Sequence, residues 1–186
     1  MVNITSAVRR VKDDLPQLLT PIVEQALREH PEHHWRNRVL PPLVTILLFV
    51  QQVLHGNTAI THLRHLSDLP FTAAAYCKAR QRLPRRLVER VADLVARQLQ
   101  PAGEAACRWR GHRVWHSDGT GVSMPDTPAL REWFGLPSGQ KPGCGFPVAT
   151  TLVLCDAAGL IAKTLAAPLR THETSQLASL HASMQA

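Results

Sequence analysis

Hydrophobic residues recur at helical spacing up to about residue 103. A first amphipathic stretch covers residues 6–28. Pro16 and Pro21 predict a break or kink in it, because proline lacks the backbone donor and its ring clashes with the preceding turn. A second helix is expected over residues 41–56, since its two leading prolines suit a first helical turn. Its apolar run, residues 43–50, is the expected centre of a helical core.

The helices that follow are predicted from capping residues. Asn57 or Thr58 is expected to cap a short helix, and Thr72 is expected to cap a second one, because their side chains can accept a hydrogen bond from the first helical turn. Pro84 then begins a longer amphipathic helix that we expect to end near Gly103. Residues 1–103 are therefore predicted to form an all-helical N-terminal domain.

Beyond Gly103 the helical spacing gives way to runs typical of strands. Three strands are predicted, over residues 113–123, 146–155 and 159–169. Residues 156–159 have the composition of a tight turn between the last two strands. A short helix is expected over residues 129–134, with Asp126 as its cap. A longer helix is expected from Glu173 onward. The expected fold class is α+β, with an α/β domain over residues 104–186.

Positive charge is concentrated in the helical part. Of a formal net charge of +7, residues 1–110 carry 16 Lys and Arg against 9 Asp and Glu, whereas residues 111–186 carry five of each. Such a basic part suggests a module that binds a polyanion, because phosphate neutralisation supplies most non-specific affinity for nucleic acid. A solvated helix surface is the alternative. The candidate DNA-binding residues are Lys78, Arg80, Arg82, Arg85, Arg86 and Arg90, on the helices that begin at Thr72 and Pro84. The two short helices over residues 57–83 could form a helix-turn-helix with the Thr72 helix in a groove of DNA.

Cysteine spacing and hydropathy exclude other classes of protein. The four cysteines are far apart and include no Cys-x-x-Cys pair, so we interpret them as reduced thiols of a cytoplasmic protein. The longest apolar run is well short of the roughly 20 residues that cross a bilayer. The N-terminus lacks the pattern of a signal peptide. No membrane partner is expected.

An acidic residue stands within the apolar strand predicted at residues 114–120. A carboxylate in a buried strand is costly unless it is paired or binds a cation, so Asp118 is a candidate metal ligand. A turn is the alternative interpretation, because Asp-Gly begins many turns. Asp156 in the tight turn, Glu173 at a helix start and Asp126 as a cap are interpreted as structural residues.

Several short motifs occur in an order that resembles a known family. They are Asp118-Gly119-Thr120, Pro125-Asp126-Thr127, Arg131-Glu132-Trp133-Phe134-Gly135, Lys141-Pro142-Gly143, Phe146-Pro147 and, upstream, the ten residues from Ala75 to Pro84. Together they resemble the end of the helical region and the start of the catalytic domain in insertion-sequence DDE transposases of the IS-Four type. The resemblance spans roughly residues 40–180.

This resemblance implies an RNase H-like catalytic domain that uses two Mg²⁺ or Mn²⁺ ions to cleave and join transposon-end DNA. Asp118 matches the first of the family's three carboxylates, and is thus the candidate catalytic residue and metal ligand. The second aspartate and the glutamate of the family come later than residue 186. We therefore expect a truncated transposase that binds DNA but is catalytically incomplete and holds metal weakly or not at all.

Other functions stay open at this point. The chain is alternatively a non-catalytic DNA-binding remnant, or an inhibitor that dimerises with a full-length transposase; a homodimer is also open. A strand ending in Asp-Gly-Thr occurs too in haloacid-dehalogenase-like phosphatases and in actin-like ATPases. The phosphatase pattern requires a nucleophilic aspartate where this chain has His116, and an actin-like site would lie near the chain start. We also expect Trp115 and Trp133 to pack as core residues.

Overall fold

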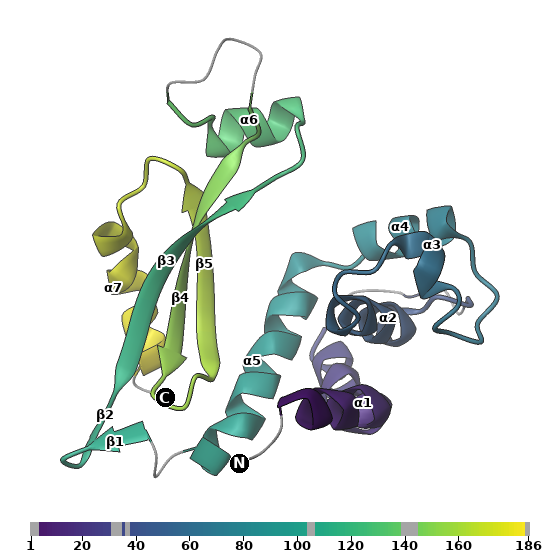
Figure 1. Cartoon of the computed structure of the whole chain (residues 1–186), viewed down its shortest axis with the longest axis horizontal. Coiled ribbons are helices and arrows are strands. Elements are labelled where there is room, and N and C mark those ends of the chain that lie inside the picture. The colour runs from purple at the N-terminus through teal and green to yellow at the C-terminus, as the bar shows by residue number, and fades with distance from the viewer. Residues whose placement is uncertain (1–3, 31–34, 36–37, 104–106, 139–144, 185–186) are drawn as a thin grey trace. The chain divides into compact units, whose positions relative to one another are not determined.

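The computed structural model describes residues 4–30, 35, 38–103, 107–138 and 145–184, and the statements below refer to these residues. The chain divides into two compact units, Met1–Val95 and Ala96–Ala186, each of which is described by itself (Figure 1). The division falls within one helix, ahead of the boundary expected after residue 103. The predicted mixture of helices and strands is confirmed: the described part of the chain has seven helices and two small antiparallel sheets.

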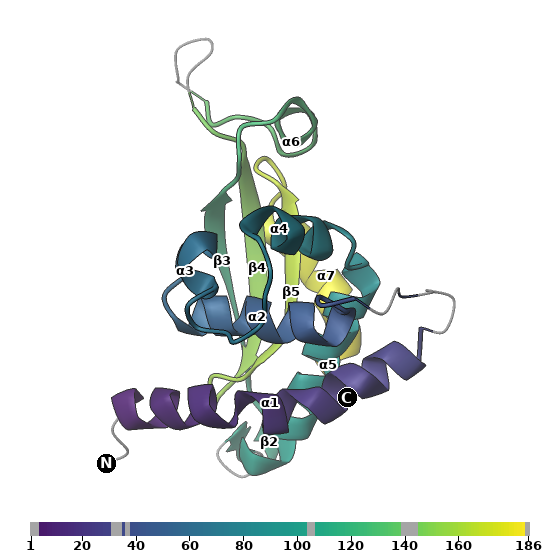
Figure 2. The same cartoon turned by 90° about the vertical axis from the view of Figure 1, so that its right-hand side faces the viewer.

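The first unit is helical. Its elements are α1 (Ile4–Arg28), α2 (Pro42–Leu54), α3 (Ile60–Leu63), α4 (Ala73–Gln81) and the beginning of α5 (Arg85–Gly103). In both views α2 lies between α1 on one side and α3 and α4 on the other (Figures 1 and 2). One hydrophobic cluster joins α1, α2 and α5 through Leu15, Leu19, Val23, Ala26, Ile46, Leu87 and Val91.

Of the break or kink predicted in the first helix, the break does not occur. Helix α1 runs unbroken through Pro16 and Pro21. Its buried residues recur every three or four positions, so they form one continuous stripe against α2 and α5. A proline costs a helix about 3 kcal/mol, whereas burying one leucine or valine side chain contributes about 1.5–3 kcal/mol. Packing along the whole stripe therefore outweighs the two prolines.

A second cluster holds the two short helices against α2. It contains Leu40, Leu48, Leu63, Phe71, Tyr76 and Ala79. Tyr76 is fully buried, and its hydroxyl donates a hydrogen bond to Gln52 Oε1 at 3.1 Å. The prediction that Thr72 caps α4 is confirmed, since its Oγ1 accepts from the Ala75 amide at 3.1 Å.

The predicted cap of α3 is wrong. Ala59 stands at the cap position without a side-chain hydrogen bond. Gly56 and Asn57 both have positive φ angles, of 70° and 56°, and turn the chain at the end of α2. Asparagine and glycine tolerate this left-handed conformation better than other residues, so Asn57 serves the preceding helix end.

The second unit is built on a three-stranded antiparallel sheet. Its strands are β3 (Trp115–Ser123), β4 (Val148–Asp156) and β5 (Ile161–Pro168), in the order β3-β4-β5. Helix α7 (Glu173–Met184) packs against β4 and β5 through a cluster that includes Leu152, Leu154 and Leu180. The three predicted strands and the final helix are thus present.

Two further elements lie at opposite ends of this sheet (Figures 1 and 2). Helix α6 (Pro128–Phe134) stands in the connection between β3 and β4. A small hairpin of β1 (Arg108–Trp109) and β2 (His112–Arg113) precedes β3. The sequence patterns predicted α6 but not the hairpin, since the first predicted strand began at Arg113.

Two expectations about α6 are wrong. Its cap is Thr127, whose Oγ1 accepts from the Leu130 amide at 3.3 Å, and not Asp126. Asp126 instead pairs with Arg131, and this hydrogen bond lowers the pKa of the Asp126 carboxyl and raises the pKa of the guanidinium. Trp133 is 70% exposed and is not the core residue that we expected, and α6 as a whole has no buried residue. Trp115, by contrast, packs partly buried against the α7 cluster as expected.

Three further expectations concern thiols, membranes and motifs. Cys77, Cys107 and Cys155 are free thiols, as predicted. Cys144 and the motif at residues 141–143 lie outside the described residues. Among the helices described, none combines the length and the apolar character needed to cross a membrane.

Candidate nucleic-acid interface and the Asp118 strand

Asp118 lies in the middle of β3, opposite Val153 of β4. The expectation that its carboxylate is buried is wrong, because the residue is exposed. Side chains along a strand alternate between the two faces of a sheet. Trp115 packs on the face covered by α7, and Asp118 stands three positions later, so it belongs to the opposite face. Its Oδ1 accepts a hydrogen bond from the neighbouring Gly119 amide, at 2.9 Å.

Asp156 has the turn role that its position predicted. It is 2% exposed, and its Oδ1 accepts hydrogen bonds from the amides of Ala158 at 3.0 Å and Leu160 at 2.9 Å. The second carboxylate oxygen lies 4.0 Å from Arg113 Nη2. Since Asp156 pairs with Trp115 across the strands, it shares the face of Trp115 and not that of Asp118.

Among the residues that the structure describes, no set of metal ligands gathers around Asp118. Hard cations such as Mg²⁺ take several oxygen ligands, of which carboxylates are the usual protein donors. Within the described ranges, no group of three His, Cys, Asp or Glu side chains gathers at one point. Glu173 begins α7, but its side chain is not among those described. We therefore derive no catalytic step from a metal at this strand.

Three of the six predicted DNA-binding residues make contacts within the helical unit. Arg80 lies over the Phe49 ring at 4.7 Å from its centroid, and over the Tyr76 ring at 5.6 Å. Arg85 Nε pairs with Glu89 Oε1 at 2.7 Å, one turn along the same helix.

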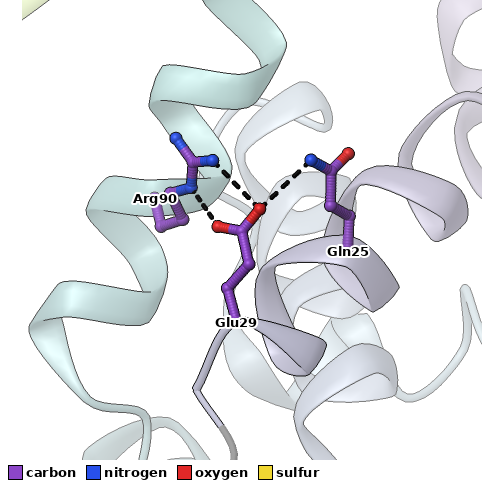
Figure 3. A network of polar contacts seen from close by, with 3 residues as sticks. All are labelled: Gln25, Glu29 and Arg90. Carbon is purple, nitrogen blue, oxygen red and sulfur yellow. Dashed lines mark hydrogen bonds and ion pairs between the residues drawn. The ribbon is translucent and has the colours of Figure 1, made fainter.

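The third contact joins two helices that are far apart in sequence (Figure 3). Both Arg90 Nε and Nη2 donate to the carboxylate of Glu29, the second to Oε1 at 3.0 Å. Gln25 Nε2 donates to the same oxygen at 3.1 Å. The hydrogen bond from Arg90 is the main reason why the pKa of Glu29 falls to about 2. Arg90 is thus a residue that ties α5 to the end of α1.

The other three predicted residues, Lys78, Arg82 and Arg86, are exposed. Lys78 and Arg82 stand one helical turn apart and so lie on the same side of α4. Both line a groove of about 520 Å³, together with Arg38 from the segment before α2. Leu40, Phe71 and Ala75 are among the residues that give the groove an apolar floor. Of the lining residues that the structure describes, none is acidic.

Arg38 is the member of this groove that sequence reasoning missed. It lies far from the cationic run along the chain, and no spacing rule connects the two. The contact of α2 with both α3 and α4 brings the segment before α2 beside α4. Only the folded chain therefore shows the three cations, Arg38, Lys78 and Arg82, as one cluster, which we name the cationic groove.

Comparison with known proteins finds no match among family models, curated proteins or solved structures.

Proposed function

We propose that this chain is a DNA-binding protein related to the insertion-sequence DDE transposases of the IS-Four type. In this proposal the helical unit binds the phosphates of a transposon-end duplex. The sheet unit corresponds to the first part of an RNase H-like catalytic domain. The observation that carries the proposal is the cationic groove, which Arg38, Lys78 and Arg82 line together and in which no lining residue within the described ranges is acidic.

Charge and exposure support a polyanion as the ligand. Three guanidinium or ammonium groups around one groove repel each other, so a bound anion lowers the electrostatic free energy of the unit. Phosphates along DNA supply such anions at close spacing. The order of motifs from Ala75 to Pro147 adds the resemblance to a transposase, which also acts on DNA.

No catalytic step is assigned to this chain. In the related transposases, three carboxylates hold the ions that activate the attacking oxygen. Asp118 matches the first of them, but it is exposed and shares no face with Asp156. The proposal is therefore confined to DNA binding by the helical unit.

The salt dependence of DNA binding tests the proposal. Anisotropy of a fluorescently labelled duplex is measured with the purified chain at several salt concentrations. For each phosphate that a cation neutralises, the slope of log affinity against log salt changes by about 0.9. The double variant Lys78→Ala/Arg82→Ala should therefore flatten this slope by up to about 1.8, since it removes two such cations. Its matched control is Arg9→Ala/Lys12→Ala, which removes the same charge from α1.

The control separates a binding site from an effect of net charge. We expect the α1 double variant to keep the slope of the unaltered chain. Equal slopes for the two double variants would show that the cationic groove is not the binding surface. A chain that binds no duplex at low salt would overturn the proposed function altogether.

A further inference from the structure

The β1–β2 hairpin has a narrow, well-defined tip. Arg108 pairs with Arg113 and Trp109 with His112, so only Arg110 and Gly111 form the turn. Both turn residues have positive φ angles, of 50° and 84°. Two left-handed residues in a two-residue loop are the geometry that matches the twist of a hairpin. The tip is therefore a compact turn and not a loose loop.

The base of the hairpin is anchored in the second unit. Cys107 is fully buried, and its carbonyl accepts a hydrogen bond from the Val114 amide at 2.8 Å. Arg113 stacks over the Trp115 ring at 4.4 Å from its centroid and lies beside the buried Asp156. Arg108 Nη1 donates to the Gly111 carbonyl at 3.1 Å across the turn. These contacts hold the ribbon in place ahead of β3.

The tip presents an aromatic ring together with positive charge. Trp109 is 64% exposed, although a buried indole would contribute more to stability. The Arg110 guanidinium lies over this ring, 4.9 Å from its centroid. Residues 107–114 contain three arginines and a histidine, and no acidic residue.

These features together select one class of ligand. A single exposed apolar side chain is common on protein surfaces and needs no explanation. A tryptophan beneath an arginine, in a segment without carboxylates, suits a ligand that is flat, aromatic and anionic. Unpaired nucleic acid has this chemistry, because its bases stack on aromatic rings and guanidinium planes while its phosphates bind arginine.

We propose that the β1–β2 hairpin is a binding site for an unpaired base of DNA. Trp109 stacks on the base, and Arg110 contacts a neighbouring phosphate. Paired bases inside a duplex already stack on both sides, so the site takes single-stranded DNA or the overhang at a duplex end. This inference rests on the proposed DNA-binding function and adds a second contact, in the unit that does not carry the cationic groove.

Binding to two labelled DNAs tests this site with the full chain. One is a blunt duplex, and the other is the same duplex with a single-stranded overhang. Alanine substitutions at stacking residues cost enough to weaken binding about ten-fold per base. Trp109→Ala should therefore reduce the preference for the overhang about ten-fold, whereas Trp109→Phe should keep most of it. Arg110→Ala should flatten the salt slope for the duplex with the overhang by about 0.7, while leaving the slope for the blunt duplex unchanged.

Trp133→Ala is the matched control, because Trp133 is also exposed but lies on α6 at the other end of the sheet. It should leave both affinities unchanged. Equal losses of affinity for Trp109→Ala and Trp133→Ala, or no loss for either, would overturn the hairpin site. If only the hairpin proposal is wrong, the chain still binds the blunt duplex, and Lys78→Ala/Arg82→Ala still weakens that binding. If the unaltered chain binds neither DNA, the proposed function and the hairpin site both fail.

Discussion

The helical unit and the sheet unit use their charged residues in different ways. On α4 and α5, some cations make contacts inside the helical unit, as Arg80 and Arg90 do. Others that are close to them in sequence, Lys78 and Arg82, line the cationic groove. On β3 and β4, two carboxylates that could share one site stand on opposite faces. Successive side chains of a helix point in different directions around its axis, so cations that are close in sequence are spread over several sides. Successive side chains of a strand point alternately to the two faces of the sheet.

This difference shows why charge density alone does not locate a binding surface. Arg90 belongs to the densest cationic run, yet its guanidinium satisfies Glu29. Arg38 lies outside that run and lines the cationic groove. The three predictions below test the separation of the two units and the roles of their charged residues.

The largest effect is expected from truncating side chains in the two cores. Leu87 belongs to the cluster of α1, α2 and α5, and Leu154 to the cluster of β4 and α7. Each is at most 1% exposed, so replacement by alanine should cost about 2–5 kcal/mol through reduced burial and a cavity. Urea unfolding of Leu87→Ala and Leu154→Ala measures this cost. We expect Leu154→Ala to spare duplex binding by the helical unit at low urea; an absence of that binding would mean that the units are not separate.

A smaller effect is expected from the Arg90 pair. The pKa of Glu29 is about 2 in the folded chain, below its ordinary value of 4.5. The ion pair therefore contributes stability above about pH 4.5, and this contribution disappears as the pH falls toward 2. The carboxylate is exposed, so solvent screening keeps the effect small.

Thermal unfolding at a series of pH values checks this expectation. Between about pH 5 and about pH 3 the midpoint of Glu29→Gln should fall less than that of the unaltered chain. Glu89→Gln, which changes the Arg85 pair within one helix, is the matched control. An identical pH dependence for the unaltered chain and Glu29→Gln would show that the Arg90 pair contributes nothing in solution.

The smallest effect is expected at Asp118. Its carboxylate is exposed and accepts from the next backbone amide, so Asp118→Ala should leave stability and duplex binding nearly unchanged. With Mg²⁺ or Mn²⁺, neither this variant nor the unaltered chain should cleave a labelled duplex, because one carboxylate does not hold two ions in line. Metal-dependent cleavage that disappears in Asp118→Ala would contradict this expectation. Asp156 and Glu173 would then be the next carboxylates to replace.

Element types were well predicted where the local signal is strong. Thr72 precedes a short helix and caps it, and Asp156 accepts from two amides in the turn between β4 and β5. Weaker signals misled: Asp126 resembled a cap, but Thr127 occupies the position directly before α6. The hairpin at residues 108–113 was missed because two-residue strands are too short to show alternation.

Local structure in this chain follows from the amino-acid sequence, because capping, turn geometry and hydrophobic period depend on residues a few positions apart. The spacing of hydrophobic residues already distinguished a helical part, up to about residue 103, from a later part with strands. Tertiary structure decided the exposure of Asp118 and Trp133, the pairing of Arg90 with a glutamate 61 positions away, and the approach of Arg38 to α4. The spacing of hydrophobic residues predicts which residues share a face of a helix or strand. Whether another element covers that face depends on contacts between segments that are distant in sequence.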